Sequence, residues 1–106
     1  MPRSWLDTPP SLARGYHAPV SASFEERLGA EGLAAGSWSN GPGDRYGEHE
    51  HSYRKVLYCV SGSIEFRLAD GERVELRPGD RLVVPAHTRH GALVGPEGCA
   101  CMEGQA

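Results

Sequence analysis

From residue 33 onward, short hydrophobic runs are separated by glycine, proline and aspartate, and this pattern restricts the possible fold more than any other feature. Residues 56–60 form an apolar run with β-branched and aromatic side chains, and this run ends at Ser61-Gly62. Apolar and polar side chains alternate over 64–68 and 73–77, and Asp70-Gly71 between them is a strong hairpin signal. Short strands at this spacing are typical of a sandwich or barrel. We therefore predict one small all-β domain.

The same reading predicts further strands and turns along the chain. The strands are expected at residues 33–38, 82–84, 90–94 and 99–103. The turns are expected at Pro78-Gly79-Asp80 and at residues 95–98, which are Gly-Pro-Glu-Gly. The domain is predicted to cover residues 21–106.

The N-terminal region has a different character. Residues 1–20 contain four prolines and little periodicity, which predicts an irregular arm. A short helix is predicted over about residues 22–31, because Ser23 and Glu26 fit a capping box and Gly32 fits the position after the helix. Phe24 and Leu28 would bury one side of this helix.

Composition excludes several classes of protein. The 106 residues carry a net charge of −3 with scattered basic residues, so nucleic acid is not an expected partner. No apolar run is long enough for a membrane span. The first residues lack the apolar core of a secretory signal, so we expect a cytoplasmic protein. The three cysteines, Cys59, Cys99 and Cys101, are expected to be reduced thiols.

Four of the five histidines form two short clusters, His49-Glu50-His51 and His87-Thr88-Arg89-His90. Histidines two residues apart on an extended segment point to the same face. Neutral imidazole is the commonest protein ligand for transition metals. A third imidazole from a distant strand could therefore complete a metal site. The fifth histidine, His17, lies in the predicted arm and is expected at the surface.

The spacing around these clusters resembles the two motifs of the cupin family. In the first, over residues 43–62, Gly43 is followed by five residues, His49-Glu50-His51, Lys55 where the family has glutamate, and Gly62. In the second, over residues 79–94, Gly79 is followed by five residues and Pro85. His87 then stands at the family's inner glycine, His90 at its histidine and Val94 at its asparagine. The resemblance covers about residues 34–103.

The resemblance implies a small jelly-roll β-barrel with a metal inside its mouth. It places His49, His51 and His90 at three of the four ligand positions, for a divalent transition metal such as Fe, Mn, Ni or Zn. It also implies a small-molecule ligand and a homodimer. His87 could also ligate the metal, but a histidine at this position is more often part of the local turn.

The fourth ligand position departs from the family, because a charged lysine cannot ligate a metal. Lys55 could bind an anionic ligand in the barrel, or could point outward and pair with Glu48 or Glu50, the interpretation we favour. Glu103 or Cys101 could replace the missing carboxylate if their side chains point inward. Trp38 and Tyr53 could line a ligand pocket with Lys55 and His87, although barrel aromatics usually belong to the core.

Two functions follow from these residues. The first is a metal-binding cupin that oxidises or isomerises a small molecule in the barrel. The second is a non-catalytic module that binds or senses a small ligand or a metal. A mainly structural or dimerising domain is a third possibility, because exposed strand edges favour pairing. The fold alone does not name a substrate.

Overall fold

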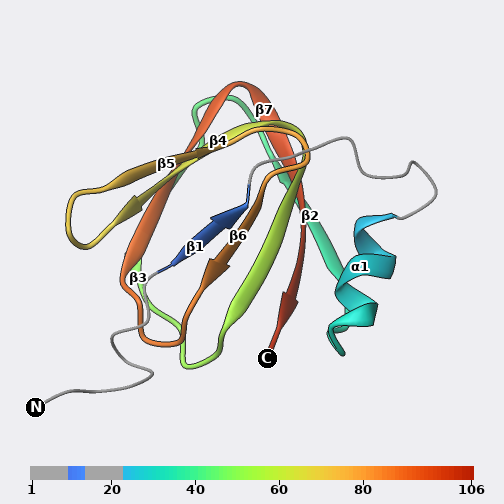
Figure 1. Ribbon diagram of the computed structural model, residues 1–106. Coiled ribbons are helices and arrows are strands. Elements are labelled where there is room, and N and C mark those ends of the chain that lie inside the picture. Colours follow the sequence, from blue (N-terminus) through green and yellow to red (C-terminus); the bar gives the residue numbers. More distant parts are fainter. Residues whose placement is uncertain (1–9, 14–22) are drawn as a thin grey trace, which may run out of the picture.

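A computed structural model describes residues 10–13 and 23–106, and it confirms the all-β class (Figure 1). The described residues contain one helix, α1 (Phe24–Ala30). The strands are β1 (Ser11–Ala13), β2 (Gly36–Asn40), β3 (Arg45–His49), β4 (Lys55–Leu68), β5 (Arg73–Leu76), β6 (Arg81–Val84) and β7 (His90–Gln105). All the strand pairs are antiparallel.

The two long strands β4 and β7 form a ribbon that folds over on itself, as the upper part of Figure 1 shows. The first half of β4 and the second half of β7 lie in one layer, in the order β1-β6-β4-β7-β2. The other halves lie in a second layer, flanked by β5 and β3. The folded ribbon therefore closes the sheet into the two-layered barrel expected from the sequence.

Two predicted breaks in the chain lie inside these strands, so both predictions were wrong. We expected a strand to end at Ser61-Gly62 and a turn at residues 95–98, but β4 and β7 run through these segments. Gly62 pairs with Cys99 and Ile64 with Val94, so the four residues 95–98 bulge opposite a single residue. A bulge bends a strand and increases its twist. The glycine and proline signals mark the bend of the ribbon.

Because successive side chains of β4 point to opposite faces, this strand contributes to two hydrophobic cores. Leu57 points between the layers and joins the main core. Val56 and Tyr58 point to the outer face, where Leu28 of α1 packs against them. Because both faces of this part of β4 are covered, residues 56–59 are all buried and read as one continuous apolar run.

The helix is confirmed with slightly different ends, 24–30 in place of about 22–31. Ser23 caps it, since its Oγ accepts a hydrogen bond from the Glu26 amide at 3.0 Å. Gly32 follows it with φ of +80°, as a residue in the C′ position requires. No helix in the described part of the chain is long and apolar enough to cross a bilayer.

The arm and the first strand also differ in detail from the prediction. Residues 11–13, expected to be irregular, form β1 against β6. Residues 1–9 and 14–20 of the arm, which include His17, lie outside the described residues. The strand expected over 33–38 is β2, displaced to 36–40. The three cysteines are free and buried, in agreement with the prediction of reduced thiols.

Candidate metal centre and ligand cavity

A cavity of about 240 Å³ lies between the two layers of the barrel. One part of its wall is apolar and aromatic, and the other part carries imidazoles and one pair of opposite charges. It is lined by Trp38, Tyr46, His49, His51, Lys55, Ile64, Phe66, His90, Ala92 and Glu103. These residues come from both halves of β4 and β7, from β2 and β3, and from the loop after β3. The folding of the ribbon therefore creates the cavity.

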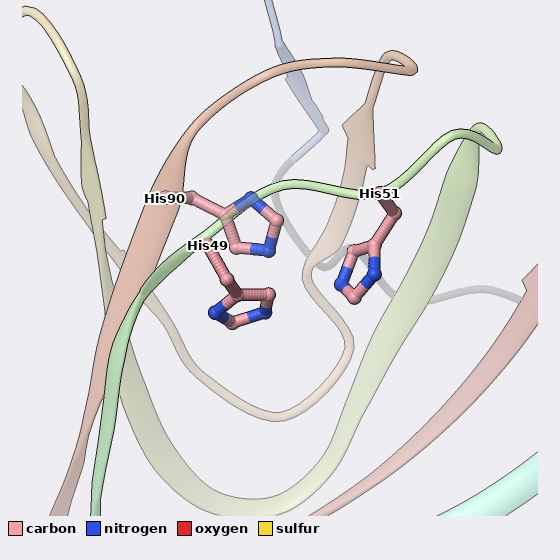
Figure 2. Close-up of side chains that lie close together, drawn as sticks. All are labelled: His49, His51 and His90. Atoms are coloured by element: carbon pink, nitrogen blue, oxygen red, sulfur yellow. The ribbon is translucent and has the colours of Figure 1, made fainter.

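Three of the predicted site residues meet at this cavity (Figure 2). His49 ends β3, His90 begins β7 and His51 lies in the loop that leads to β4. The rings of His49 and His90 have centroids 4.5 Å apart, and His51 lies 4.7 Å from His49 and 5.4 Å from His90. His51 lies beyond the end of the strand, so simple alternation along one strand does not account for its position.

Backbone carbonyls orient two of the three rings. Nδ1 of His49 lies 2.7 Å from the carbonyl oxygen of Gly47, and Nδ1 of His90 lies 2.8 Å from that of Thr88. A carbonyl oxygen can only accept, so each Nδ1 carries a proton, and in the neutral ring each Nε2 keeps its lone pair. Metal-binding histidines are commonly held in this way by a hydrogen bond from the second ring nitrogen.

Buried nitrogens of the triad lack a hydrogen-bond partner. Nε2 of His90 and Nε2 of His51 are both enclosed, and neither has a partner among the described residues. A buried polar atom without a partner destabilises the folded state by about 1–3 kcal/mol. Since each of these atoms can offer a lone pair, a metal ion is the kind of partner that would satisfy both.

The electrostatic environment favours neutral imidazoles. Burial lowers the pKa of His90, and the neighbouring His49, Lys55 and His51 lower it further against a raising effect of the Thr88 carbonyl. Burial also lowers the pKa of His51, with Lys55 and His49 acting in the same direction. Only a neutral imidazole can ligate a metal. The lowered pKa values therefore keep these side chains ready to ligate.

The triad could hold a single metal ion. The nitrogens that could ligate all lie within 4.8 Å of one another. Nitrogens bound to one ion at about 2.1 Å can be at most about 4.2 Å apart. The rings would therefore have to move closer together for all three imidazoles to ligate one divalent ion.

Lys55 does not pair with Glu48 or Glu50, so the outward interpretation favoured from the sequence is wrong. Its side chain is 12% exposed, and its Nζ lies 3.6 Å from Oε1 of Glu103. The same oxygen accepts a hydrogen bond from Nε1 of Trp38 at 2.8 Å. β4 and β7 pair here, with Lys55 opposite Gln105 and Leu57 opposite Glu103, and this pairing brings the two charges together.

Two other residues suggested for the pocket do not line the cavity. Tyr53 instead stacks on His51, with the two ring centroids 4.7 Å apart. His87 is exposed, its Nδ1 lies 3.5 Å from Oε2 of Glu50, and its backbone has φ of +63°. Its amide donates a hydrogen bond to the His51 carbonyl at 2.7 Å. The turn around His87 therefore helps to hold the loop that carries His51.

Trp38 lines the cavity, as the sequence suggested, whereas Tyr46, Ile64 and Phe66 in the same wall were not predicted there. Ile64 and Phe66 have the alternation of inward-facing residues, so their position between the layers could have been inferred. Tyr46 could not, since residues 46 and 49 would face opposite ways on a regular strand. A bulge in β3 between these two residues changes the phase, so both line the cavity. The glycine at position 91 lets β3 lie close to β7 here, because a Cβ on residue 91 would lie 3.0 Å from the carbonyl oxygen of Tyr46.

The metal-free protein is expected to lose stability as the pH falls below about 6.5. Unfolded histidines titrate near pH 6.5, whereas the pKa values of His51 and His90 are lowered in the folded protein. Between the two values the unfolded chain binds more protons, so this contribution to stability is present at higher pH and is lost on acidification. Urea denaturation with a chelator at about pH 7.5 and about pH 5.5 measures the effect.

His90→Gln is the control for this pH dependence. Glutamine keeps a polar side chain but does not titrate, so the difference in unfolding free energy between the two pH values should become smaller. A wild-type protein that is as stable at the lower pH as at the higher one would contradict the lowered pKa values.

Comparisons with known proteins agree with this architecture. The family model described as "Cupin domain" matches residues 37–100. KdgF from Halomonas sp. is a solved structure that is 32% identical, with a TM-score of 0.59, over 69% of this chain and 67% of that one. An RmlC-like cupin from Shewanella frigidimarina is 30% identical, with a TM-score of 0.61, over 69% of this chain and 64% of that one.

One curated relative is an enzyme of which this chain matches a small part. Quercetin 2,3-dioxygenase from Bacillus subtilis is 44% identical over an alignment of 54 residues, and the match covers 49% of this chain and 16% of that enzyme. The chain therefore spans far less than the length of that relative. The match of the family model, together with the solved structures, is nevertheless decisive for the domain: this chain belongs to the cupin family.

Proposed function

We propose that this protein is a metal-binding cupin in which His49, His51 and His90 hold a divalent transition metal. The observation that carries the proposal is the pair of buried Nε2 atoms, on His51 and His90, that lack a partner among the described residues. Two of the rings are held with Nδ1 against backbone carbonyls, which leaves Nε2 as the donor of a lone pair. Fe, Mn, Ni and Zn all accept imidazole ligands.

We further propose that a small molecule is oxidised or isomerised in the cavity. A bound metal would act as a Lewis acid toward oxygen atoms of that molecule. The chain itself supplies three imidazoles and would leave other coordination positions open, while Trp38, Ile64 and Phe66 form an apolar wall that excludes water from one side. The similarity to part of quercetin 2,3-dioxygenase supports oxidation. The missing ligating carboxylate at residue 55 distinguishes this site from the usual family pattern.

Metal analysis combined with an oxygen assay tests the proposal. The purified protein is expected to retain about one divalent metal per chain, and each reconstituted form would be assayed for oxygen uptake with catechols, β-diketones and thiols. Uptake with any of these would support metal-dependent oxidation. A protein that binds no divalent metal above background would refute the metal site.

The alternative is a non-catalytic module that binds or senses a small ligand or a metal. The observation that favours it is the position of Glu103, which is paired with Lys55 and Trp38 and would have to leave both partners to ligate. Full metal occupancy without oxygen uptake or isomerisation of any compound would support this alternative. The homodimer and the cytoplasmic location stay predictions.

A further inference from the structure

Lys55 places an ammonium group in the wall of the cavity. Its side chain is 12% exposed, and its partner in the described part of the chain is Glu103, with 3.6 Å between Nζ and Oε1. This distance is longer than a good hydrogen bond, so the contact is an ion pair. An ammonium has three N–H donors. Lys55 can therefore donate to a further oxygen atom in the cavity.

Glu103 is held independently of Lys55. Its Oε1 accepts from Nε1 of Trp38 at 2.8 Å, and its Oε2 accepts from Nε2 of Gln105 at 3.3 Å. Its side chain is 13% exposed, so the carboxylate is largely removed from solvent. A carboxylate fixed in this way attracts the flexible lysine side chain to one place. Glu103 therefore acts as a positioning residue for the Lys55 ammonium.

The balance of charge in the cavity favours an anionic ligand. The three imidazoles are neutral when they ligate, and the charges of Lys55 and Glu103 offset each other. A divalent ion at the triad would therefore keep both of its positive charges, whereas a ligating carboxylate would offset one of them. Charges interact more strongly in a partly enclosed site than in water. Lys55 lines the same cavity as the three imidazoles, so its ammonium lies at the space next to the triad.

The apolar wall and the volume limit the size of the ligand. Trp38, Ile64 and Phe66 line one part of the cavity, which measures about 240 Å³. An apolar protein cavity of about 150 Å³ accommodates benzene. The space is therefore suited to one ring, or a group of similar size, with a few polar substituents.

We propose that Lys55 is the anion-binding residue of this cavity and that its ligand is a small anion about the size of one aromatic ring. One charged oxygen of the ligand accepts a hydrogen bond from the Lys55 ammonium, and the apolar body of the ligand contacts the apolar wall formed by Trp38, Ile64 and Phe66. A second oxygen reaches the metal at the triad, and this contact rests on the function proposed above.

Calorimetric titration with 2-hydroxybenzoate and with its neutral amide tests this assignment. Both probes have one ring with a hydroxyl next to a carbonyl group, and the amide replaces the charged carboxylate oxygen with a neutral NH₂ group. Lys55→Met is expected to weaken binding of 2-hydroxybenzoate about tenfold or more, and binding of the amide less than about twofold. Glu103→Gln is expected to strengthen binding of 2-hydroxybenzoate, because it removes the carboxylate that competes for Lys55 and keeps an acceptor for Trp38.

The opposite signs in the two variants separate anion binding from a structural role. If both variants weakened both probes equally, the assignment of Lys55 would be overturned. Metal content is measured in every sample, and the titrations are repeated on metal-free protein. A protein without metal would refute the proposed function alone, since discrimination by Lys55 could still be measured. A metal-loaded protein that does not discriminate between the probes through Lys55 would refute only this inference.

Discussion

Replacing His90 with alanine is expected to weaken divalent metal binding by more than about a hundredfold. Loss of a group that merely orients a metal ligand costs about 10- to 100-fold in affinity, and loss of the ligand itself should cost more. His90 is 1% exposed, so water cannot easily take the place of its imidazole. Competition with a chromophoric chelator would measure the affinity, and circular dichroism would show that the variant is folded.

His87→Ala is the matched control, because it removes a histidine of the same cluster whose side chain lies outside the cavity lining. The metal affinity of the His87→Ala variant should stay within about threefold of the wild type, since no side chain that would bind the metal is lost. His49→Ala should instead behave like His90→Ala. Equal affinities in the His90 and His87 variants would contradict the three-histidine site and would favour ligands outside the triad.

Replacing Gly62 with alanine is expected to destabilise the protein by at least about 3 kcal/mol, a large part of the 5–15 kcal/mol typical of a domain. Gly62 lies at the bend of the β4–β7 ribbon with φ of +72°. A Cβ there would lie 2.0 Å from the backbone oxygen of Gly98 and 2.8 Å from its carbonyl carbon. These are main-chain atoms of the paired strand, so the clash can be relieved only by moving the bulge. Urea denaturation of the metal-free protein would measure the change.

Gly43→Ala separates the clash from the cost of the backbone conformation. Gly43 has a similar φ of +76°, but a Cβ there would meet nothing within 4 Å. The control should therefore lose only about 1–2 kcal/mol, the cost of a left-handed conformation for alanine. A Gly62 variant no less stable than the Gly43 variant would show that the ribbon can open at the bulge without loss.

The β-rich class could be predicted because strand patterning is local. Alternation over residues 64–68 and 73–77, with Asp70-Gly71 between them, corresponds to the hairpin of β4 and β5. The helix could be placed within two residues at each end, because its cap is a contact between residues three apart. The spacing of the two motifs placed His49, His51 and His90 together because the positions within a family motif imply a common fold.

The errors arise where long-range pairing changes the meaning of a local signal. Gly62 and residues 95–98 carry signals of chain reversal, but the strands continue through them because each supplies the partner for the other. A bulge of this kind is invisible to a reading of one strand at a time. Tyr46 was missed for the same reason, since the bulge in β3 changes its side.

Lys55 shows the same division between local and long-range information. The motif spacing marks residue 55 as the place of a missing carboxylate, but it does not say where the lysine points. Its direction depends on Glu103, which is 48 positions away and is brought near by the pairing of β4 with β7. The charge of Glu103 favours the inward position over pairing with Glu48 or Glu50.

The sequence by itself determined the β class, the short helix and which three histidines lie together, because strand alternation, helix capping and motif spacing all act over a few residues. The tertiary structure alone decided that the two long strands fold over as one ribbon. It also decided that the aromatic wall faces the triad and that Lys55 and Glu103 meet inside the cavity. These features depend on register and bulges between strands distant in the chain, where a shift of one residue turns a side chain to the opposite face.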